Sequence, residues 1–484
     1  MRVLYIDIDT LRPDHLGCYG YPRNTSPNLD ALAQEGVRFE RCYTSDAPCL
    51  PSRAALLTGM FGIRNGAVGH GGTAADLRLT GCERGFQDFI PENGFHSIFR
   101  KAGMYTASVS TFSQRHSSYW FNAGLNEVYN QGGCGGESGE EVIPYALDWL
   151  KRNREREDWF LHLHLWDPHT PYRTPADYVN PFEGDELPTW ITPDIFKHHQ
   201  SLVAPHGVNE IGMYTDRENP AFPKHPGKLN NHGELRRVWD GYDCGIHYAD
   251  SLLGQVFDLL KEQGIYEDTA IILSSDHGEN LGELGIYGEH GTADDITCRV
   301  PLIIKWKGAK KGHVDTAFHY SLDLLPTLAD LLGVPKQAHW DGQSFADTLL
   351  KGAKMGRDHL VISQMAHVCQ RSARFEDWLY IRTIHDGFRL FDKEMLFNLK
   401  DDPHEQFDIK DDYPEVCARG AKMILDWQEE MMLKGPQTID PMWTVMSEGG
   451  PFHTRGELEG YLKHLIKTGR AEGAARLKAK HGKN

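Results

Sequence analysis

The sequence lacks the features that would direct it to a membrane, to nucleic acid or to an oxidising compartment. No apolar run is long enough for a signal-peptide core or a membrane span. The nine cysteines show no Cys-x-x-Cys spacing, which argues against a zinc ribbon or a thioredoxin-type motif. Lys and Arg total 51 against 68 Asp and Glu, and the net charge of −17 argues against nucleic acid or an acidic membrane as partner. We therefore expect a cytoplasmic protein with mostly reduced thiols.

What the sequence does contain is typical of a large α/β enzyme. Its 484 residues suffice for two domains, and 40% hydrophobic and 25% charged residues are ordinary for a globular protein. Patterns of buried strands alternate with helical patterns, and the strand patterns cover residues 1–8, 106–111, 159–166, 270–276 and 300–306. This alternation predicts a large, mostly parallel sheet sandwiched by helices.

The pattern changes after residue 350. Short strand candidates follow at 358–364, 378–384 and 388–392, and polar helical segments come after them. We predict a catalytic α/β domain over residues 1–350 and a smaller C-terminal α+β subdomain over 351–484. The segment between residues 180 and 234, rich in Pro, Asn and His, predicts an excursion from the sheet of the kind that often carries specificity.

Acidic and histidine side chains follow two of the predicted strands. Asp9 leaves the first strand, and Asp276 and His277 leave the strand at 270–276. Ligands of doubly wound sheets bind beyond the carboxyl ends of the strands, and two carboxylates with an imidazole suit a divalent metal. Asp7, on the same face as Asp9, is a candidate further ligand or a partner of the ligands. Helix or loop capping by these aspartates is the plainer alternative.

Further basic side chains lie in segments that the same edge of the sheet would gather. His169 follows a buried strand and could protonate a leaving group. Arg115 is suited to clamp a tetrahedral oxyanion, and His116 is its neighbour. His70 lies in a glycine-rich loop, and His290 lies in a later loop. A surface or ordinary loop role is the alternative for each of them.

The stretch CLPSRAALLTG, residues 49–59, joins a cysteine to the start of a helix. Pro51 fits the first helical turn, so Cys49 would lie at the positive end of the helix dipole. That position would favour a thiolate and would attract a bound oxyanion, and Arg53 can reach back toward residue 49. Cys49 could therefore be a buried core thiol, a thiolate nucleophile, or the precursor of a modified residue.

The residues CLPSR at 49–53, followed by LTG at 57–59, resemble the Cys-x-Pro-Ser-Arg signature of the type I sulfatases of the alkaline phosphatase superfamily. Other segments resemble sulfatase segments in the same order: IDTLRPDHLGCYGY, SPNLDALAQEGVRF, WDPHTPY, SSDHGENLGE, RVPLIIKW and EMLFNLKDDPHEQFD. The resemblance covers about residues 2–410. It implies an alkaline-phosphatase-like fold and the activity of a sulfuric ester hydrolase.

The resemblance also implies a cofactor and a modification. Asp9, Asp276 and His277 look like ligands of Ca²⁺, with Mg²⁺ or Mn²⁺ as alternatives, and hard oxygen donors favour Ca²⁺ over zinc. Cys49 looks like the cysteine that a formylglycine-generating or an anaerobic sulfatase-maturating enzyme converts to Cα-formylglycine. The modified residue would complete the metal site.

In the mechanism that the resemblance implies, a hydroxyl of the formylglycine hydrate at position 49 attacks sulfur. The alcohol leaves, the second hydroxyl is deprotonated, and sulfate is expelled as the aldehyde reforms, so no water has to attack a crowded sulfur. Arg53 looks like the group that supports the hydrate, and His169 looks like the residue that handles the leaving group.

The sequence departs from the family pattern at three places. Thr10 stands where many sulfatases have a second aspartate, so we expect either a metal with fewer carboxylate ligands or Asp7 as a substitute ligand. The family's Gly-Lys-Trp-His stretch is absent, and we assign its roles to Arg115 and His116. A lysine of the loop after Asp-His-Gly is also missing, and His290 takes its place, which predicts a positive charge that depends on pH.

The leading hypothesis is a hydrolase of sulfate esters on a saccharide, such as a glycosaminoglycan-type fragment. The alternatives are a phosphonate monoester or phosphodiester hydrolase of the same superfamily, an arylsulfatase of broad specificity, a hydrolase that uses an unmodified Cys49, and a catalytically silent binding protein. The coexistence of Cys49, Arg53 and His169 with the Asp-His pair argues against the silent protein. The oligomeric state stays open.

Overall fold

The computed structural model describes residues 1–77, 92–435 and 439–482. Its centre is an eight-stranded sheet with the strand order β11-β2-β10-β7-β1-β6-β4-β5. The strands of this sheet are β1 (Arg2–Ile8), β2 (Val37–Tyr43), β4 (Tyr105–Val109), β5 (Glu127–Tyr129), β6 (Trp159–Leu165), β7 (Thr269–Ser274), β10 (Arg299–Lys305) and β11 (His313–Tyr320). Strand β10 runs antiparallel to both neighbours, and the other pairings are parallel.

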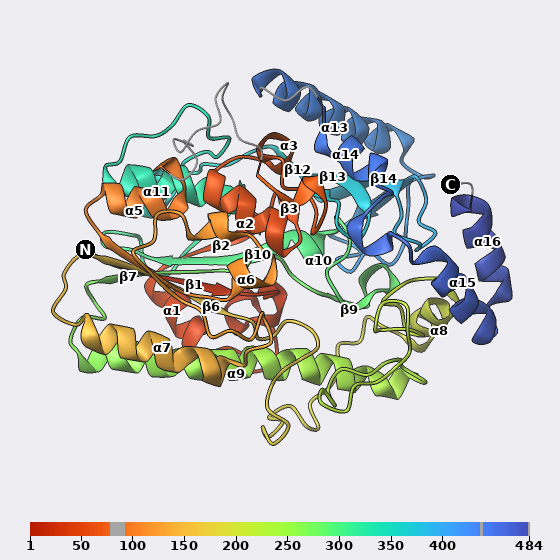
Figure 1. The fold of residues 1–484 in the computed structure, drawn as a ribbon, viewed down its shortest axis with the longest axis horizontal. Coiled ribbons are helices and arrows are strands. Elements are labelled where there is room, and N and C mark those ends of the chain that lie inside the picture. Colours follow the sequence, from red (N-terminus) through yellow and green to blue (C-terminus); the bar gives the residue numbers. More distant parts are fainter. Residues whose placement is uncertain (78–91, 436–438, 483–484) are drawn as a thin grey trace.

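Helices cover both faces of this sheet, as Figure 1 shows. One face packs against α1 (Pro27–Glu35), α7 (Gly139–Arg152) and the long α9 (Leu235–Glu262). The opposite face packs against α2 (Cys49–Thr58), α5 (Phe95–Lys101) and α11 (Leu324–Leu332). Strand β1 is buried on both sides, with Leu4 and Ile6 in one core and Val3 and Tyr5 in the other. The mostly parallel α/β sandwich predicted from the sequence is therefore confirmed.

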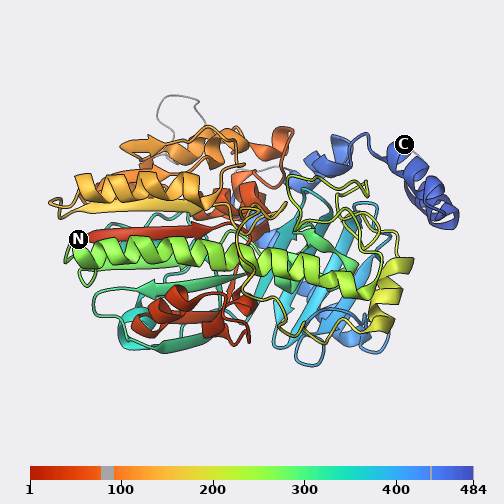
Figure 2. The same ribbon diagram turned by 90° about the horizontal axis from the view of Figure 1, so that it is seen from below.

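A second sheet is antiparallel apart from one pairing and has the order β15-β14-β13-β12-β3. Four of its strands come from the end of the chain: β12 (His359–Gln364), β13 (Cys369–Phe375), β14 (Trp378–His385) and β15 (Glu394–Asn398). Helix α13 (Pro414–Lys434) packs on it, and α14 (Pro441–Ser447), α15 (Leu458–Lys467) and α16 (Ala471–His481) follow. Figure 2 shows α9 extending from the region of the eight-stranded sheet toward the region of the second sheet.

The strand predicted at residues 388–392 is wrong, because that segment is a loop. Phe388 and Leu390 have φ values of 66° and 55°, and an extended strand cannot include such left-handed residues. The prediction was based on the apolar residues of this segment, but Phe388 is buried as part of a loop and not of a strand.

Other short helices and strands are α3 (Gly62–Asn65), α6 (Phe112–Arg115), α8 (Pro193–Ser201), α10 (Asp295–Cys298), α12 (Ala346–Lys351), β8 (Asn280–Leu281) and β9 (Tyr287–Glu289).

One strand of the second sheet comes from the start of the chain. Strand β3 (Asp46–Ala47) pairs in parallel with β12, and the Ser363 amide donates to the Ser45 carbonyl at 2.9 Å. Helix α2 begins two residues after β3, at Cys49. The second sheet therefore holds the backbone that leads into Cys49.

No helix within the described ranges combines the length and apolarity needed to cross a bilayer.

Replacing Ser363 by proline tests this coupling. Proline lacks the amide that bonds to Ser45, and leaving the buried carbonyl unpaired should lower the free energy of unfolding by about 1–3 kcal/mol. Because β3 leads directly into Cys49, turnover should fall as well. Ser363→Ala keeps the amide and should behave like wild type in urea unfolding and turnover; equal behaviour of the two variants would contradict the coupling.

Candidate active site and metal centre

Four side chains meet where β1, β7 and α2 come together. Asp9 follows β1, Asp276 and His277 follow β7, and Cys49 is the first residue of α2. Strands β1 and β7 are parallel neighbours, so their carboxyl ends open at the same edge of the sheet. One candidate ligand atom from each of these side chains lies within 4.8 Å of the others.

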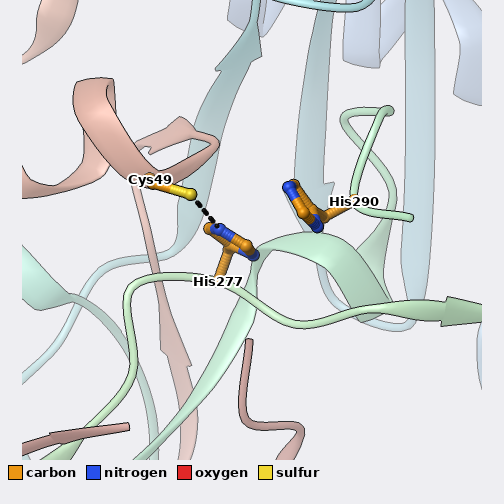
Figure 3. A group of neighbouring side chains, drawn as sticks. All are labelled: Cys49, His277 and His290. Carbon is orange, nitrogen blue, oxygen red and sulfur yellow. Dashed lines mark hydrogen bonds between the residues drawn. The ribbon is translucent and has the colours of Figure 1, made fainter. Parts of the chain in front are cut away.

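The distances within this group fit a cation centre. Cys49 Sγ lies 3.1 Å from His277 Nε2, a contact that Figure 3 marks, and His277 Nε2 lies 3.3 Å from Asp276 Oδ2 and 3.9 Å from Asp9 Oδ1. Asp9 Oδ1 is buried, and no hydrogen bond to it is found in the described part of the chain. A bound cation would satisfy this buried oxygen, and two carboxylates with an imidazole suit Ca²⁺, Mg²⁺ or Mn²⁺.

Arg53 ties the carboxylates together beneath Cys49. Its guanidinium pairs with Asp276, reaches Asp9 Oδ2 at 3.1 Å and donates to Asp7 Oδ2 at 2.9 Å. Arg53 is only 1% exposed, and it sits one helical turn after Cys49 in α2. Although burial alone would lower it, the pKa of Arg53 lies well above its usual range because of these carboxylates. The arginine is a fixed positive charge inside the site.

The structure does not bring Asp7 into the group of four. Its carboxylate faces the Arg53 guanidinium and lies 3.5 Å from His162 Nε2. Burial raises the pKa of Asp7, but Arg53 and His162 outweigh it and hold the pKa below its usual range. Asp7 is therefore placed to orient Arg53.

Cys49 is not poised as a thiolate, in contrast to the expectation from its place at a helix start. Burial, Asp9 and Asp276 raise the pKa of the thiol well above its usual value, and Arg53 only partly opposes them. Desolvation of a side chain that is 1% exposed, together with the two carboxylates, outweighs the effect of the helix dipole on this thiol. A thiol in this state is a poor nucleophile at neutral pH.

An open cavity of about 740 Å³ lies above this group and reaches Cys49. The basic residues expected at the site all line it: His70, Arg115, His116, His169 and His290. The structure thus gathers them from segments far apart in the chain. Of the group of four, Cys49 lines the cavity, and Asp9, Asp276 and His277 lie next to Cys49 beneath it; we call these four residues the floor, and the basic residues form part of the wall.

His169 and His290 stand closest to the floor. Their rings lie 5.1 Å apart, His290 lies 4.1 Å from the His277 ring, and His169 Nε2 lies 3.9 Å from Asp9 Oδ1. Figure 3 shows His290 facing His277 and Cys49. Burial lowers the pKa of both rings, that of His290 to about 3. His290 is therefore a neutral ring at neutral pH, not the pH-dependent positive charge expected from the sequence.

Arg115 and His116 differ in their surroundings. Arg115 is exposed, and its guanidinium lies over the Trp166 ring at 5.1 Å. His116 is half-buried, and burial followed by the charges of Arg115 and Arg53 lowers its pKa to about 3. Arg115 supplies the positive charge at the cavity wall, and His116 supplies a neutral hydrogen-bonding group.

Sequence reasoning missed the other histidines of this wall. His367 and His453 come from the C-terminal part and line the same cavity, and Glu289 Oε1 lies 3.7 Å from His367 Nε2 and 3.2 Å from His290 Nε2. Only the count of 25 histidines hinted at such a cluster. No spacing in the sequence pairs positions so distant.

The sequence model of the sulfatase family matches residues 2–334. The chain belongs to the sulfatase family. Membership makes this protein a sulfuric ester hydrolase, and four of the five strands of the second sheet lie beyond the matched residues.

Individual proteins agree with this membership. The sulfatase is 26% identical over 480 residues to an arylsulfatase of Clostridium perfringens, covering 90% of this chain and 94% of that protein. Its fold is similar to that of a protein solved with its substrate D-glucosamine-2-N,6-O-disulfate, with TM-score 0.69, 18% identity and coverage of 91% and 99%. A phosphonate monoester hydrolase of Agrobacterium radiobacter gives TM-score 0.67, 20% identity and coverage of 89% and 96%.

The contrast between Asp276 and Asp7 predicts different effects of neutralising them. Asp276→Asn should lower the affinity for added Ca²⁺ by about 10–100-fold, because it weakens a candidate cation ligand. Asp7→Asn is the matched variant, and calcium should stay at the wild-type level. Elemental analysis with calcium titration measures both; loss of calcium in Asp7→Asn would make Asp7 a ligand.

The buried carboxyl of Asp167, near the site, makes the stability of the fold depend on pH. Asp167 precedes the segment that holds His169, and its Oδ2 accepts from the Gly139 amide at 2.9 Å. Burial raises its pKa to about 6, from an ordinary value of 3.8. Because the folded pKa lies above the unfolded one, the protonated group stabilises the fold at low pH, and this contribution is lost as pH rises through about 6.

Asp167→Asn should therefore gain stability over wild type as pH rises. From about pH 5 to about pH 7 the difference in free energy of unfolding between variant and wild type should grow by about 1 kcal/mol. Urea unfolding at the two pH values measures it. Asp194→Asn, at an exposed position of α8, is the control, and its free energy of unfolding should change with pH as that of wild type does. If the free energy of unfolding of Asp167→Asn also changed with pH as that of wild type does, the raised pKa of Asp167 would be contradicted.

Proposed function

We propose that this sulfatase hydrolyses sulfate esters of saccharides, with Cys49 converted to Cα-formylglycine as the nucleophile. The observation that carries the proposal is the position of Cys49: it adjoins Asp9, Asp276, His277 and Arg53, and burial together with the two carboxylates raises the pKa of its thiol. A maturating enzyme, either formylglycine-generating or anaerobic, is the partner that this requires. Replacing the sulfur by oxygen would turn an inert thiol into a group suited to a hard cation.

A divalent cation, with Ca²⁺ as the first candidate, would be held by Asp9, Asp276, His277 and the converted residue 49. When bound, it withdraws electron density from the sulfate oxygens and favours the negative charge of the nucleophile. Arg53 orients Asp9 and Asp276 and keeps a positive charge next to residue 49.

His169 is placed to give a proton to the leaving alcohol. Its Nδ1 contacts the Thr170 carbonyl, so the Nδ1 hydrogen is donated there and Nε2 is left toward the floor. Its pKa is lowered, chiefly by burial, so the protonated ring is a strong proton donor. A sulfate anion in the cavity would favour protonation of this ring, which couples substrate binding to the acid function.

The cavity supports a saccharide rather than a flat aromatic alcohol. Its volume of about 740 Å³ lies within the usual range of ligand sites of about 300–1,000 Å³. Arg115, His70 and His116 offer charge and hydrogen bonds at the wall, and sugars present hydroxyls to such groups. The similar fold solved with a sulfated glucosamine gives further support.

Phosphonate monoester hydrolysis is the second candidate. A phosphonate ester is also a tetrahedral anion, so the cation, Arg53 and His169 could act on it in the same way. The similar phosphonate monoester hydrolase structure favours this candidate.

Rates on matched esters decide between these activities. We expect kcat/KM to be highest for sulfated mono- or disaccharides, lower for a sulfated phenol and lowest for a phenyl phosphonate ester. Cys49→Ala should lower kcat/KM by about 10³-fold or more with the fold intact. If kcat/KM for the phenyl phosphonate ester exceeded that for every sulfate ester, the proposed function would be wrong. If kcat/KM for the sulfated phenol exceeded that for every sulfated saccharide, the assignment to saccharides would be wrong.

Mass analysis of the peptide that contains Cys49, on the same preparation, tests the nucleophile separately. The proposal expects the peptide to carry the aldehyde in proportion to the specific activity. An intact thiol in fully active enzyme would rule out the formylglycine nucleophile.

A further inference from the structure

Two apolar side chains, Met213 and Phe452, line the cavity, and the chemistry at the floor uses neither of them. Met213 comes from the long segment between α8 and α9, and Phe452 comes from the segment between α14 and α15. Phe452 is 43% exposed, although it lines the cavity among polar groups. An aromatic ring left open in a ligand cavity marks a surface that a bound molecule can cover.

Hydrogen bonds join the two segments that carry these side chains. The Tyr214 hydroxyl donates to the His453 carbonyl at 2.9 Å, so the residue after Met213 is bonded to the residue after Phe452. The Met213 carbonyl in turn accepts from the His206 amide at 3.2 Å. Met213 and Phe452 therefore belong to one region of the wall, and we call this pair the apolar edge.

Phe452 is fixed in place by the chain around it. Arg455 Cζ lies over its ring at 5.9 Å, and Arg455 bonds to the Gly450 carbonyl at 2.9 Å and pairs with Glu448 at 3.1 Å. Gly71 passes so close to the ring that a Cβ on it would lie 2.2 Å from Phe452 Cε2. A ring that is already ordered loses little freedom when a ligand covers it, which favours binding.

A series of rings leads from the floor to the apolar edge. The His290 ring lies 4.1 Å from that of His277 and 6.1 Å from that of His367. The His453 ring stacks on His367 at 4.0 Å, and Phe452 lies 5.2 Å from His453. Three histidines thus separate Phe452 from the floor along this wall. A sugar whose sulfate is attacked at the floor would lie beside the first of them, and the apolar edge is left for the unit joined to that sugar.

The surroundings of the apolar edge favour a sugar over a wholly apolar alcohol. A pyranose ring presents C–H groups on its faces and hydroxyls at its rim, so one face can pack on an aromatic or thioether side chain while the hydroxyls form hydrogen bonds. His70 Nε2 and His116 Nε2 have no hydrogen-bond partner among the described residues, and both histidines line the cavity. An apolar alcohol would leave such groups unpaired, whereas hydroxyls can pair with them.

Resting on the proposed function, we propose that Met213 and Phe452 form a platform for the sugar joined to the sulfated one. This sulfatase then prefers sulfated disaccharides to sulfated monosaccharides. Because the platform is remote from the reacting sulfur, it binds the ground state and the transition state equally. It therefore lowers KM for the disaccharide and leaves kcat nearly unchanged.

Matched saccharides test the platform. The substrates are sulfated disaccharides prepared from heparin and chondroitin sulfate, together with the monosaccharide sulfates that correspond to their sulfated rings. Wild type should show the lower KM for a disaccharide. Phe452→Ala should raise that KM by about 10-fold or more, because the apolar face of the second sugar stays uncovered, and should change kcat by less than about twofold. Kinetic constants for the monosaccharide should also change by less than about twofold.

Three further variants separate the platform from a general effect on the fold. Phe452→Tyr keeps the ring and should keep KM near the wild-type value, whereas Met213→Gln keeps the length of the side chain without its apolarity and should raise KM for the disaccharide. Phe407→Ala removes a side chain that is 62% exposed and does not line the cavity, and it should leave both substrates unaffected. Circular dichroism verifies that each variant is folded.

The platform is overturned if folded Phe452→Ala changes KM for the disaccharide and the monosaccharide by the same factor, or changes neither. It is also overturned if wild type has the lower KM for the monosaccharide. Failure of the proposed function gives a different result: wild type would then hydrolyse no sulfated saccharide of either length, and the platform would fall with it.

Discussion

The active site depends on one buried arginine among three carboxylates. Arg53 joins α2 to the ends of β1 and β7, because its partners Asp7, Asp9 and Asp276 come from those strands. Without the arginine, three carboxylates would be left near one another in a region screened from water, an arrangement that costs several kcal/mol. The same contacts set the distance between Cys49 and the candidate metal ligands, so stability and catalytic geometry share one interaction.

The cavity above this floor is a product of both sheets. The eight-stranded sheet supplies the floor through the carboxyl ends of its strands, while His367 and His453 come from the part of the chain that contains the second sheet. Strand β3 crosses from the first part into the second sheet just before Cys49. The wall of the cavity is thus fixed to the same backbone that positions Cys49, so the positions of the wall and of Cys49 depend on each other.

The sequence predicted the floor well because the relevant side chains directly follow buried strands. Asp9, Asp276 and His277 could be placed at one edge from the rule for parallel sheets alone. The ionisation of Cys49 could not be predicted, since it depends on burial beside carboxylates rather than on the helix start. The His367–His453 pair was equally out of reach, because ring stacking between loops leaves no periodic signal in the chain.

The near-complete burial of Cys49 has a consequence for the order of events during synthesis. Under the proposed conversion, a maturating enzyme would have to act before the fold closes over this side chain, which is 1% exposed. The partner of β3 is β12, whose residues leave the ribosome roughly 300 positions after Cys49; at about 5–20 residues per second this allows on the order of 15–60 s. Under the proposal, the length of chain between the two paired strands would therefore set the time available for conversion of residue 49.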